Sequence, residues 1–371
     1  MDRDSKKYWV ALNMVVGVGK TLFHRLVTSL GSPQKVFQAT RHELQGIARL
    51  PDKTVDQIRG FDVDRHAERE FKLVEAMGAQ ILTLESPDYP ELLKSIYDPP
   101  PVLYYKGKNP RDLTPSLAVV GTRLASSYGK IAAERLCGSL ASMGLCIVSG
   151  MARGIDTIAH KAALEAGGAT LAVFGCGLEH TYPPENGSLK KRIIEQGAIL
   201  SEFPMSTQPD RNNFPARNRV ISGLSYGTLV IEAGQKSGAL ITAQFSLEQG
   251  REVFSIPGNI YSGKSQGTNQ LIKMGAKLVD SPEAVVEELP EWIQTALKKK
   301  AAIQVEVMDL SSSEKHLLSL LTAEEQHIDN LIENSYLSPA QVSATLIQLE
   351  LKGVVRQMEG KMFLTNCVEM D

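Results

Sequence analysis

The feature that most constrains the fold is an alternation of short apolar runs with amphipathic segments between Leu117 and Gly258. The apolar runs are LAVVG, LCIVSG, TLAVFG, AILSEF, GTLVIEA and REVFSIPG. Runs without polar alternation are typical of strands buried on both faces, and parallel strands require crossover connections that are usually helices. The pattern therefore predicts an α/β fold with a central Rossmann-like, doubly wound, mostly parallel sheet.

Composition divides the rest of the chain into smaller parts. Short helical patterns separated by Gly and Pro predict an N-terminal all-helical domain of the SAM or helix-hairpin-helix type. The tail has three helical segments followed by a hairpin with Glu359-Gly360 at its turn, which predicts a winged helix. The expected parts are an N-terminal helical domain at 1–85, a proline-rich connector packing on the core at 86–116, the Rossmann-like domain at 117–290, a linker at 291–306 and the winged helix at 307–371.

The overall composition is that of a soluble globular protein. Of 371 residues, 43% are hydrophobic and 22% are charged, with a net charge of −2. The four cysteines form no CxxC pair, so neither a disulfide framework nor a metal site is expected. No signal peptide and no apolar run near the ~20 residues of a membrane span are present, so we expect a cytoplasmic protein without membrane contact.

A glycine-rich turn follows the first run of the α/β region. It reads GTRLASSYG and departs from the dinucleotide pattern G-x-G-x-x-G, because Arg123 and Ser126 replace two glycines. No nucleotide cofactor is therefore expected. The helix start and the Arg123 guanidinium favour an anion, although Arg123 could instead pair with Glu202 or Glu232.

Two further turns follow other strands of the predicted sheet. SGMARGID ends at Asp156, which we expect to cap or orient the turn, and IEAGQKSGALITA contains Glu232 and the Ser237-Gly238 helix start. Ligands of such sheets bind beyond the carboxyl ends of the strands. The glycine-rich turns that favour an anion should therefore lie together at the carboxyl edge of the sheet.

The stretch NFPARNRVISGLS precedes the GTLVIEA run. It places Arg217 and Arg219 around Asn218, with Phe214 at its start. The N–H donors of an arginine guanidinium fit the oxygens of a phosphate, and an aromatic ring can stack on a base. Together with the glycine turns, the stretch has the composition of a groove for single-stranded nucleic acid.

The sequence GVGKT, from Gly17 to Thr21, ends like a Walker A loop. The full pattern needs a glycine where Met14 stands, and no strong strand precedes it, so no nucleotide site is expected there. The turn resembles a helix-hairpin-helix turn. It can be a capped turn in a packing module or a DNA contact.

Three side chains resemble catalytic groups without the context that catalysis needs. His160 fits a hydrogen-bonded core histidine better than a catalyst. Cys176 lies between glycines in a strand-end loop, and no pattern links His180 to it as a base. No catalytic residue is predicted.

The ordered motifs resemble those of the DprA family, also called Smf, of bacterial DNA-processing proteins. The similarity extends from YPELLKSIYDPPPVLYYKG through VVGTRLASSYG, IVSGMARGIDTIAHKAAL, GCGLEHTYPPEN, NFPARNRVISGLS and VIEAGQKSGALITA to GREVFSIPG. It implies single-stranded DNA binding during natural transformation and loading of the RecA recombinase, without known turnover. The DNA pocket that it implies consists of Gly121, Thr122, Arg123, Ser149, Gly150, Phe214, Arg217, Asn218 and Arg219.

An enzymatic alternative remains open. The lysine-decarboxylase-like group hydrolyses the N-glycosidic bond of nucleoside monophosphates and carries a PGGxGTxxE signature. This chain reads LSYGTLVIEAG, which keeps Gly227-Thr228 and Glu232 but lacks Pro-Gly-Gly. The difference weakens the hydrolase hypothesis.

Two expectations concern assembly and the tail. GTNQLIKMGAKLVD presents apolar side chains at Leu271, Ile272 and Met274, which favours a homodimer through the α/β domain, although they could pack on their own sheet. The expected recognition helix, SPAQVSATLIQLELKG, has one Lys and one Glu. A helix so poor in basic residues is not expected to be the main DNA reader.

Overall fold

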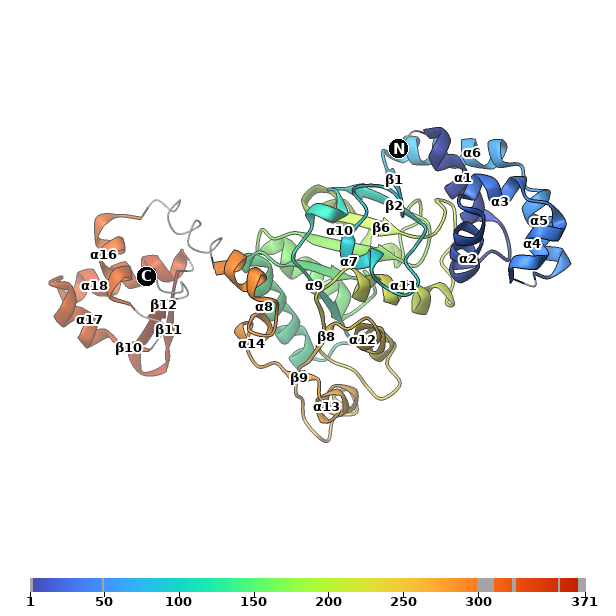
Figure 1. Cartoon of the computed structure of the whole chain (residues 1–371). Coiled ribbons are helices and arrows are strands. Elements are labelled where there is room, and N and C mark those ends of the chain that lie inside the picture. Colours follow the sequence, from blue (N-terminus) through green and yellow to red (C-terminus); the bar gives the residue numbers. More distant parts are fainter. Residues whose placement is uncertain (1–2, 49, 299–309, 322–324, 353, 366–371) are drawn as a thin grey trace. The chain divides into compact units, whose positions relative to one another are not determined.

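The computed structural model describes residues 3–48, 50–298, 310–321, 325–352 and 354–365. These residues divide into two compact units, Met1–Leu289 and Pro290–Asp371. Each unit is described by itself (Figure 1).

A nine-stranded sheet forms the centre of the first unit, in the order β1-β2-β6-β5-β4-β3-β7-β8-β9. The strands are β1 (Gln80–Thr83), β2 (Val102–Gly107), β3 (Ser116–Val120), β4 (Cys146–Ser149), β5 (Thr170–Phe174), β6 (Ala198–Ser201), β7 (Gly227–Val230), β8 (Glu252–Ser255) and β9 (Lys277–Leu278). From β6 to β9 all neighbours are parallel, whereas β1 and β2 pair antiparallel at one edge. The doubly wound, mostly parallel sheet predicted from the sequence is confirmed.

Both faces of the sheet are covered, as the continuous apolar runs require. Along β5, Ala172 and Phe174 belong to one hydrophobic cluster, and Leu171 and Val173 to the other. The first cluster includes side chains of α9 and α10, and the second those of α11 and α12. The helices of this part are α7 (Glu91–Lys94), α8 (Ser127–Met143), α9 (Ile155–Glu165), α10 (Gly187–Gln196), α11 (Asn213–Gly223), α12 (Ala239–Glu248), α13 (Gln266–Lys273) and α14 (Glu283–Val286).

Six helices precede the sheet, in agreement with the expected helical N-terminal region. They are α1 (Arg3–Met14), α2 (Lys20–Leu30), α3 (Pro33–Gln38), α4 (Arg41–Ala48), α5 (Asp52–Arg59) and α6 (Val63–Met77). The sequence did not predict β1 and β2, which lie in the segments read as the end of the helical domain and as the connector. Strand β2 pairs with β6 and β1 pairs with β2, so together with β9 at the other edge they extend the sheet beyond the six predicted strands.

The GVGKT turn packs against the α/β part of the same unit. Gly17 has a φ of 88°, and α2 begins at Lys20 after the N-cap residue Gly19. The Lys20 ammonium lies 2.8 Å from a carboxylate oxygen of Glu202, and burial lowers the pKa of Lys20. Since this lysine already has a protein anion as its partner, the contact supports a packing role for the turn.

The second unit contains a helix at 291–298 and the small domain of the tail. Its elements are α16 (Ser312–Leu320), β10 (Gln326–His327), α17 (Ile328–Ser335), α18 (Pro339–Leu351), β11 (Val355–Met358) and β12 (Met362–Thr365). A short turn at Glu359–Lys361 joins the last two strands, in agreement with the predicted hairpin and winged helix. Across the described ranges of the chain, no helix is long and apolar enough to cross a membrane.

Candidate nucleic-acid interface

The carboxyl edge of the sheet is built by close contacts between glycine turns and α11. A side chain at Gly150, after β4, would overlap the Arg217 guanidinium, and one at Gly175, after β5, would overlap the Phe214 ring. At Gly154 a side chain would overlap the backbone of the turn after β3. Glycine at these positions lets the first turn of α11 and the strand-end loops come together, as the sequence predicted.

Arg217 is buried within this edge and forms hydrogen bonds to the backbone at the ends of β4 and β5. The residue is only 4% exposed, and Nη1 donates hydrogen bonds to the carbonyls of Gly150, at 2.8 Å, and Val173. Nε donates to Asn218 Oδ1 at 3.1 Å. Burial lowers the pKa of Arg217 to about 10, so the group is protonated at neutral pH and adds a positive field behind the surface.

Asp156 orients the turn after β4, as expected. Its Oδ2 accepts hydrogen bonds from the amides of Gly150, at 3.2 Å, and Ala152, at 3.3 Å. The side chain is 6% exposed, and burial raises its pKa even though Arg217 lies nearby.

The exposed part of the edge carries Arg123 and two aromatic rings. The Arg123 side chain is exposed, and its guanidinium carbon lies 5.7 Å from the centre of the half-buried Phe214 ring. Phe214 in turn stacks on Tyr182, with ring centres 5.3 Å apart and planes inclined by 30°. Tyr182 is 38% exposed and was not among the residues predicted from the sequence. The only sequence signal was an aromatic residue in the loop after β5.

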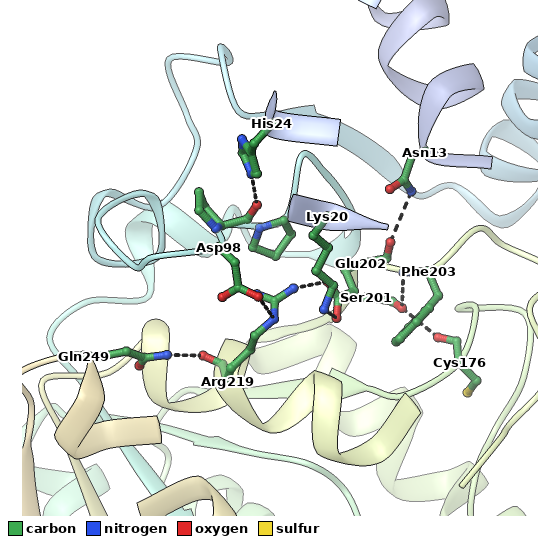
Figure 2. Close-up of polar contacts among 12 residues, drawn as sticks. Asn13, Lys20, His24, Asp98, Cys176, Ser201, Glu202, Phe203, Arg219 and Gln249 are labelled. Atoms are coloured by element: carbon green, nitrogen blue, oxygen red, sulfur yellow. Dashed lines mark hydrogen bonds and ion pairs between the residues drawn. The ribbon is translucent and has the colours of Figure 1, made fainter. Parts of the chain in front are cut away.

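Arg219 does not share this surface with Arg123 and Arg217. Its Nε lies 3.1 Å from Asp98 Oδ2, and Nη2 forms an ion pair with Glu202, which also binds Lys20 (Figure 2). Arg219 is 3% exposed. Two residues that are two positions apart on a helix point about 200° apart, so Arg217 and Arg219 face different sides of α11.

Glu232 stabilises the turn after β3. Its two carboxylate oxygens accept hydrogen bonds from the Ser126 amide, at 2.8 Å, and the Ser126 hydroxyl, at 2.6 Å. Its backbone carbonyl accepts the amide of Thr122 at 2.7 Å. Neither Glu232 nor Glu202 is paired with Arg123, the arrangement that the sequence had left open.

Most of the remaining expected residues form hydrogen bonds with the backbone of the strands and loops at this edge. Ser149 is buried, and its hydroxyl donates to the Val119 carbonyl at 2.6 Å. Asn218 Nδ2 donates to the Gly238 carbonyl at 3.4 Å, and the Ser237 hydroxyl accepts the Ala239 amide at 3.3 Å. The half-buried Gly121 and Thr122 lead into the exposed Arg123.

Of the three residues that resembled catalytic groups, the two histidines have hydrogen-bond partners and the cysteine is buried. His160 is fully buried, its Nδ1 lies 2.6 Å from Thr170 Oγ1, and burial lowers its pKa to about 3. Burial raises the pKa of the Cys176 thiol to about 11, and His180 contacts the Ser206 carbonyl. Within the described ranges, no group of three or more metal-ligating side chains occurs.

A full match to the P-loop pattern, which was not predicted from the sequence, lies between β8 and α13. Residues 258–265 read GNIYSGKS. The amide of Gly258 already donates to Asn269 at 3.1 Å, and that of Ser265 donates to the Ser262 carbonyl at 3.0 Å. Because these two amides are already bonded within the protein, the loop is not arranged as a nucleotide cradle.

Comparison with known proteins fits this arrangement. Residues 80–290 match the family described as DNA recombination-mediator protein A, and residues 305–361 match the DprA winged helix domain. The chain belongs to the DNA recombination-mediator protein A family. The resemblance seen in the motifs is thereby confirmed.

Members of this family resemble the chain over most of its length. Protein Smf of Synechocystis is 34% identical over 97% of this chain and 98% of its own. DNA processing protein DprA of Bacillus subtilis is 44% identical over 65% of this chain and 84% of its own. The X-ray structure of DprA from Streptococcus pneumoniae superposes with a TM-score of 0.68 at 37% identity, covering 76% of this chain and 98% of that one.

A further solved relative has been studied for its binding of single-stranded DNA. This is DNA processing protein A from Helicobacter pylori, whose structure is titled for its single-stranded DNA binding mode. It superposes with a TM-score of 0.51 at 32% identity, covering 59% of this chain and 97% of that one.

Proposed function

We propose that this protein binds single-stranded DNA along the carboxyl edge of its sheet and delivers the strand to the RecA recombinase during transformation, without catalytic turnover. The observation that carries the proposal is the exposed guanidinium of Arg123 beside the stacked rings of Phe214 and Tyr182. A cation next to aromatic faces is the combination that holds a phosphate and an unpaired base.

Each part of the surface has a distinct task in this proposal. Arg123 contacts a backbone phosphate, since its fork can donate two hydrogen bonds. The Phe214–Tyr182 pair offers a stacking face to a base. The buried charge of Arg217 strengthens the field without leaving its carbonyl partners. The stacking step disfavours duplex DNA, because paired bases cannot reach the rings.

The protein is proposed to act as a homodimer in the cytoplasm. In the segment that favoured dimerisation, Leu271 packs into the core, whereas Met274 is 67% and Leu278 is 48% exposed. Strand β9 ends the sheet, and an edge strand can pair with another copy. Light scattering at tens of micromolar should give a dimer mass. A monomer that binds DNA normally would contradict this assembly.

The hydrolase alternative receives little support from the site. A nucleosidase needs a carboxylate facing the substrate, and both oxygens of Glu232 are held by Ser126. Incubation with nucleoside monophosphates should release no free base. Release of base that is lost in Glu232→Gln would favour the enzyme instead.

The binding proposal is tested by titrating labelled oligo-dT and a duplex of equal length into the protein. Oligo-dT should bind more tightly, and Arg123→Ala should weaken its binding by about 1.5 to 3 kcal/mol, the value of a charge-assisted hydrogen bond. The log-log salt slope should fall by about 0.7, as for one lost phosphate contact on a single strand. The control is Arg135→Ala, an exposed arginine on α8. Unchanged affinity and slope in a folded Arg123→Ala protein would overturn the proposal.

A further inference from the structure

The loops that follow β3, β7 and β8 form one continuous surface beside Arg123. The Lys264 ammonium donates to the Leu124 carbonyl at 2.7 Å, and the Tyr128 hydroxyl donates to the Pro257 carbonyl at 2.7 Å. A side chain on Gly234, after β7, would contact the Gly263 carbonyl after β8. The edge that carries Arg123 therefore continues without a break to the loop after β8.

This surface is basic although the chain as a whole is slightly acidic. The three segments 121–130, 234–238 and 257–266 contain no Asp or Glu. Their basic residues, all exposed, are Arg123, Lys130, Lys236 and Lys264. The acidic residue next to them, Glu232, is buried and bound to Ser126. Affinity for phosphates follows such a local field rather than the net charge of −2.

An aromatic ring projects from the far end of the same surface. Tyr261 is 90% exposed, and Ile260 beside it is 74% exposed. The backbone that carries them is ordered by Asn259, whose side chain accepts the Tyr261 amide at 2.8 Å and whose carbonyl accepts the Ser262 amide at 3.0 Å. An exposed tyrosine on an ordered loop costs little conformational entropy when a flat ligand covers it.

The sheet fixes the direction of this surface relative to the Phe214–Tyr182 pair. Phe214 contacts the end of β5, Arg123 follows β3, and Tyr261 lies after β8. The strand order β5-β4-β3-β7-β8 places four steps of about 4.8 Å between the two ends. The track is about 19 Å long, which is enough for several nucleotides.

We propose that a bound single strand continues from the Phe214–Tyr182 pair past Arg123 to Tyr261, which stacks on a second base, while Lys236 and Lys264 contact phosphates. The inference rests on the proposed function and extends it by a second subsite. The subsite is reached only by a strand long enough to cross the edge. A short strand occupies the inner aromatic pair alone.

The test compares a short oligo-dT of about 4 nucleotides with a long one of about 16, the range over which single-strand sites vary. Tyr261→Ala should weaken the long strand by about fivefold or more and the short strand by less than about twofold, the loss expected for one stacked base. Tyr261→Trp should restore tight binding, whereas Tyr261→Leu should not. The matched control is Tyr336→Ala, which removes a tyrosine that is 95% exposed in the winged helix.

The two lysines give an independent readout. Lys264→Ala and Lys236→Ala should each lower the salt slope of the long strand by about 0.7 and leave that of the short strand unchanged. Lys53→Ala, an exposed lysine on α5, serves as the control. These variants change exposed side chains, and circular dichroism verifies that they are folded.

The outcomes separate the second subsite from the first. If Arg123→Ala weakens both strands and the Tyr261 and Lys264 variants weaken neither, the second subsite is wrong and the proposed function stands. If Arg123→Ala also has no effect, the proposed function fails as well. If Tyr261→Ala changes the mass of the protein in solution without changing DNA binding, the ring belongs to a protein contact and the inference is overturned.

Discussion

The guanidinium of Arg219 lies between the carboxylates of Glu202 and Asp98, with its Nε 3.1 Å from Asp98 Oδ2. Glu202 follows β6, Asp98 belongs to the segment after α7, and Lys20 of α2 completes the cluster (Figure 2). Two cations and two anions therefore balance one another where α11, the sheet, the connector and the N-terminal helices meet. This cluster holds α11 in place behind the carboxyl edge that is proposed to bind DNA.

Replacing Arg219 by Ala should reduce stability rather than remove a DNA contact. Breaking a buried ion pair from one side costs about 3 to 5 kcal/mol. Here Asp98 loses its ion pair and Glu202 keeps only Lys20. Urea denaturation should show this loss in the free energy of unfolding. Arg211→Ala, an exposed arginine just before α11, should change it by less than about 0.5 kcal/mol. A stable Arg219→Ala protein with a lower salt slope would show that Arg219 contacts DNA after all.

The sequence grouped Arg217 and Arg219 because they are neighbours in a motif. Helical periodicity separates them, and applying it to α11 would have predicted that they face different sides. The buried strands β3 to β8 were predictable because continuous apolar runs leave little choice. The antiparallel strands β1 and β2 were missed, since they lie beside proline-rich and helical segments.

Tyr182 illustrates what the sequence leaves open at the site. It is 32 residues from Phe214 in the chain, and no periodicity connects the loop after β5 with the start of α11. Their stacking follows from the three-dimensional path of the chain. Arg123, by contrast, was predictable, because an arginine in the turn that follows a parallel strand lies at the carboxyl edge of the sheet.

Phe214→Ala should separate stacking from charge. Loss of the ring should weaken oligo-dT binding by about 1 to 3 kcal/mol and leave the salt slope nearly unchanged, because no phosphate contact is lost. Anisotropy titrations at several salt concentrations measure both quantities. Phe37→Ala in α3 is the control for loss of a half-buried ring away from the edge. A fall in slope equal to that of Arg123→Ala would contradict a purely stacking role.

Deleting residues 305–371 should change oligonucleotide affinity by less than about threefold, since a DNA-reading helix needs exposed basic side chains. On α18 the exposed side chains include Ile347 and Leu351, and the lysine that follows the helix, Lys352, pairs with Glu314 at 2.8 Å. These contacts suit a protein partner better than phosphate. Filter binding with the shortened and full chains measures the effect. A loss of about a hundredfold would instead make the winged helix the main reader.

His160 should make stability depend on pH below neutrality. Its folded pKa is about 3 because the ring is fully buried and lies near the charge of Arg217, whereas an unfolded histidine titrates near 6.5. Between these values the unfolded chain binds the extra proton, so the free energy of unfolding should fall as the pH decreases from about 6.5, by up to about 1.4 kcal/mol per unit. Urea midpoints between pH 7.5 and 5 should therefore decline less steeply in His160→Gln than in the wild type. His42→Gln, which changes an exposed histidine, should retain the wild-type slope. Parallel curves for all three proteins would show that folded His160 takes up its proton at the same pH as an unfolded histidine, which would contradict the lowered pKa.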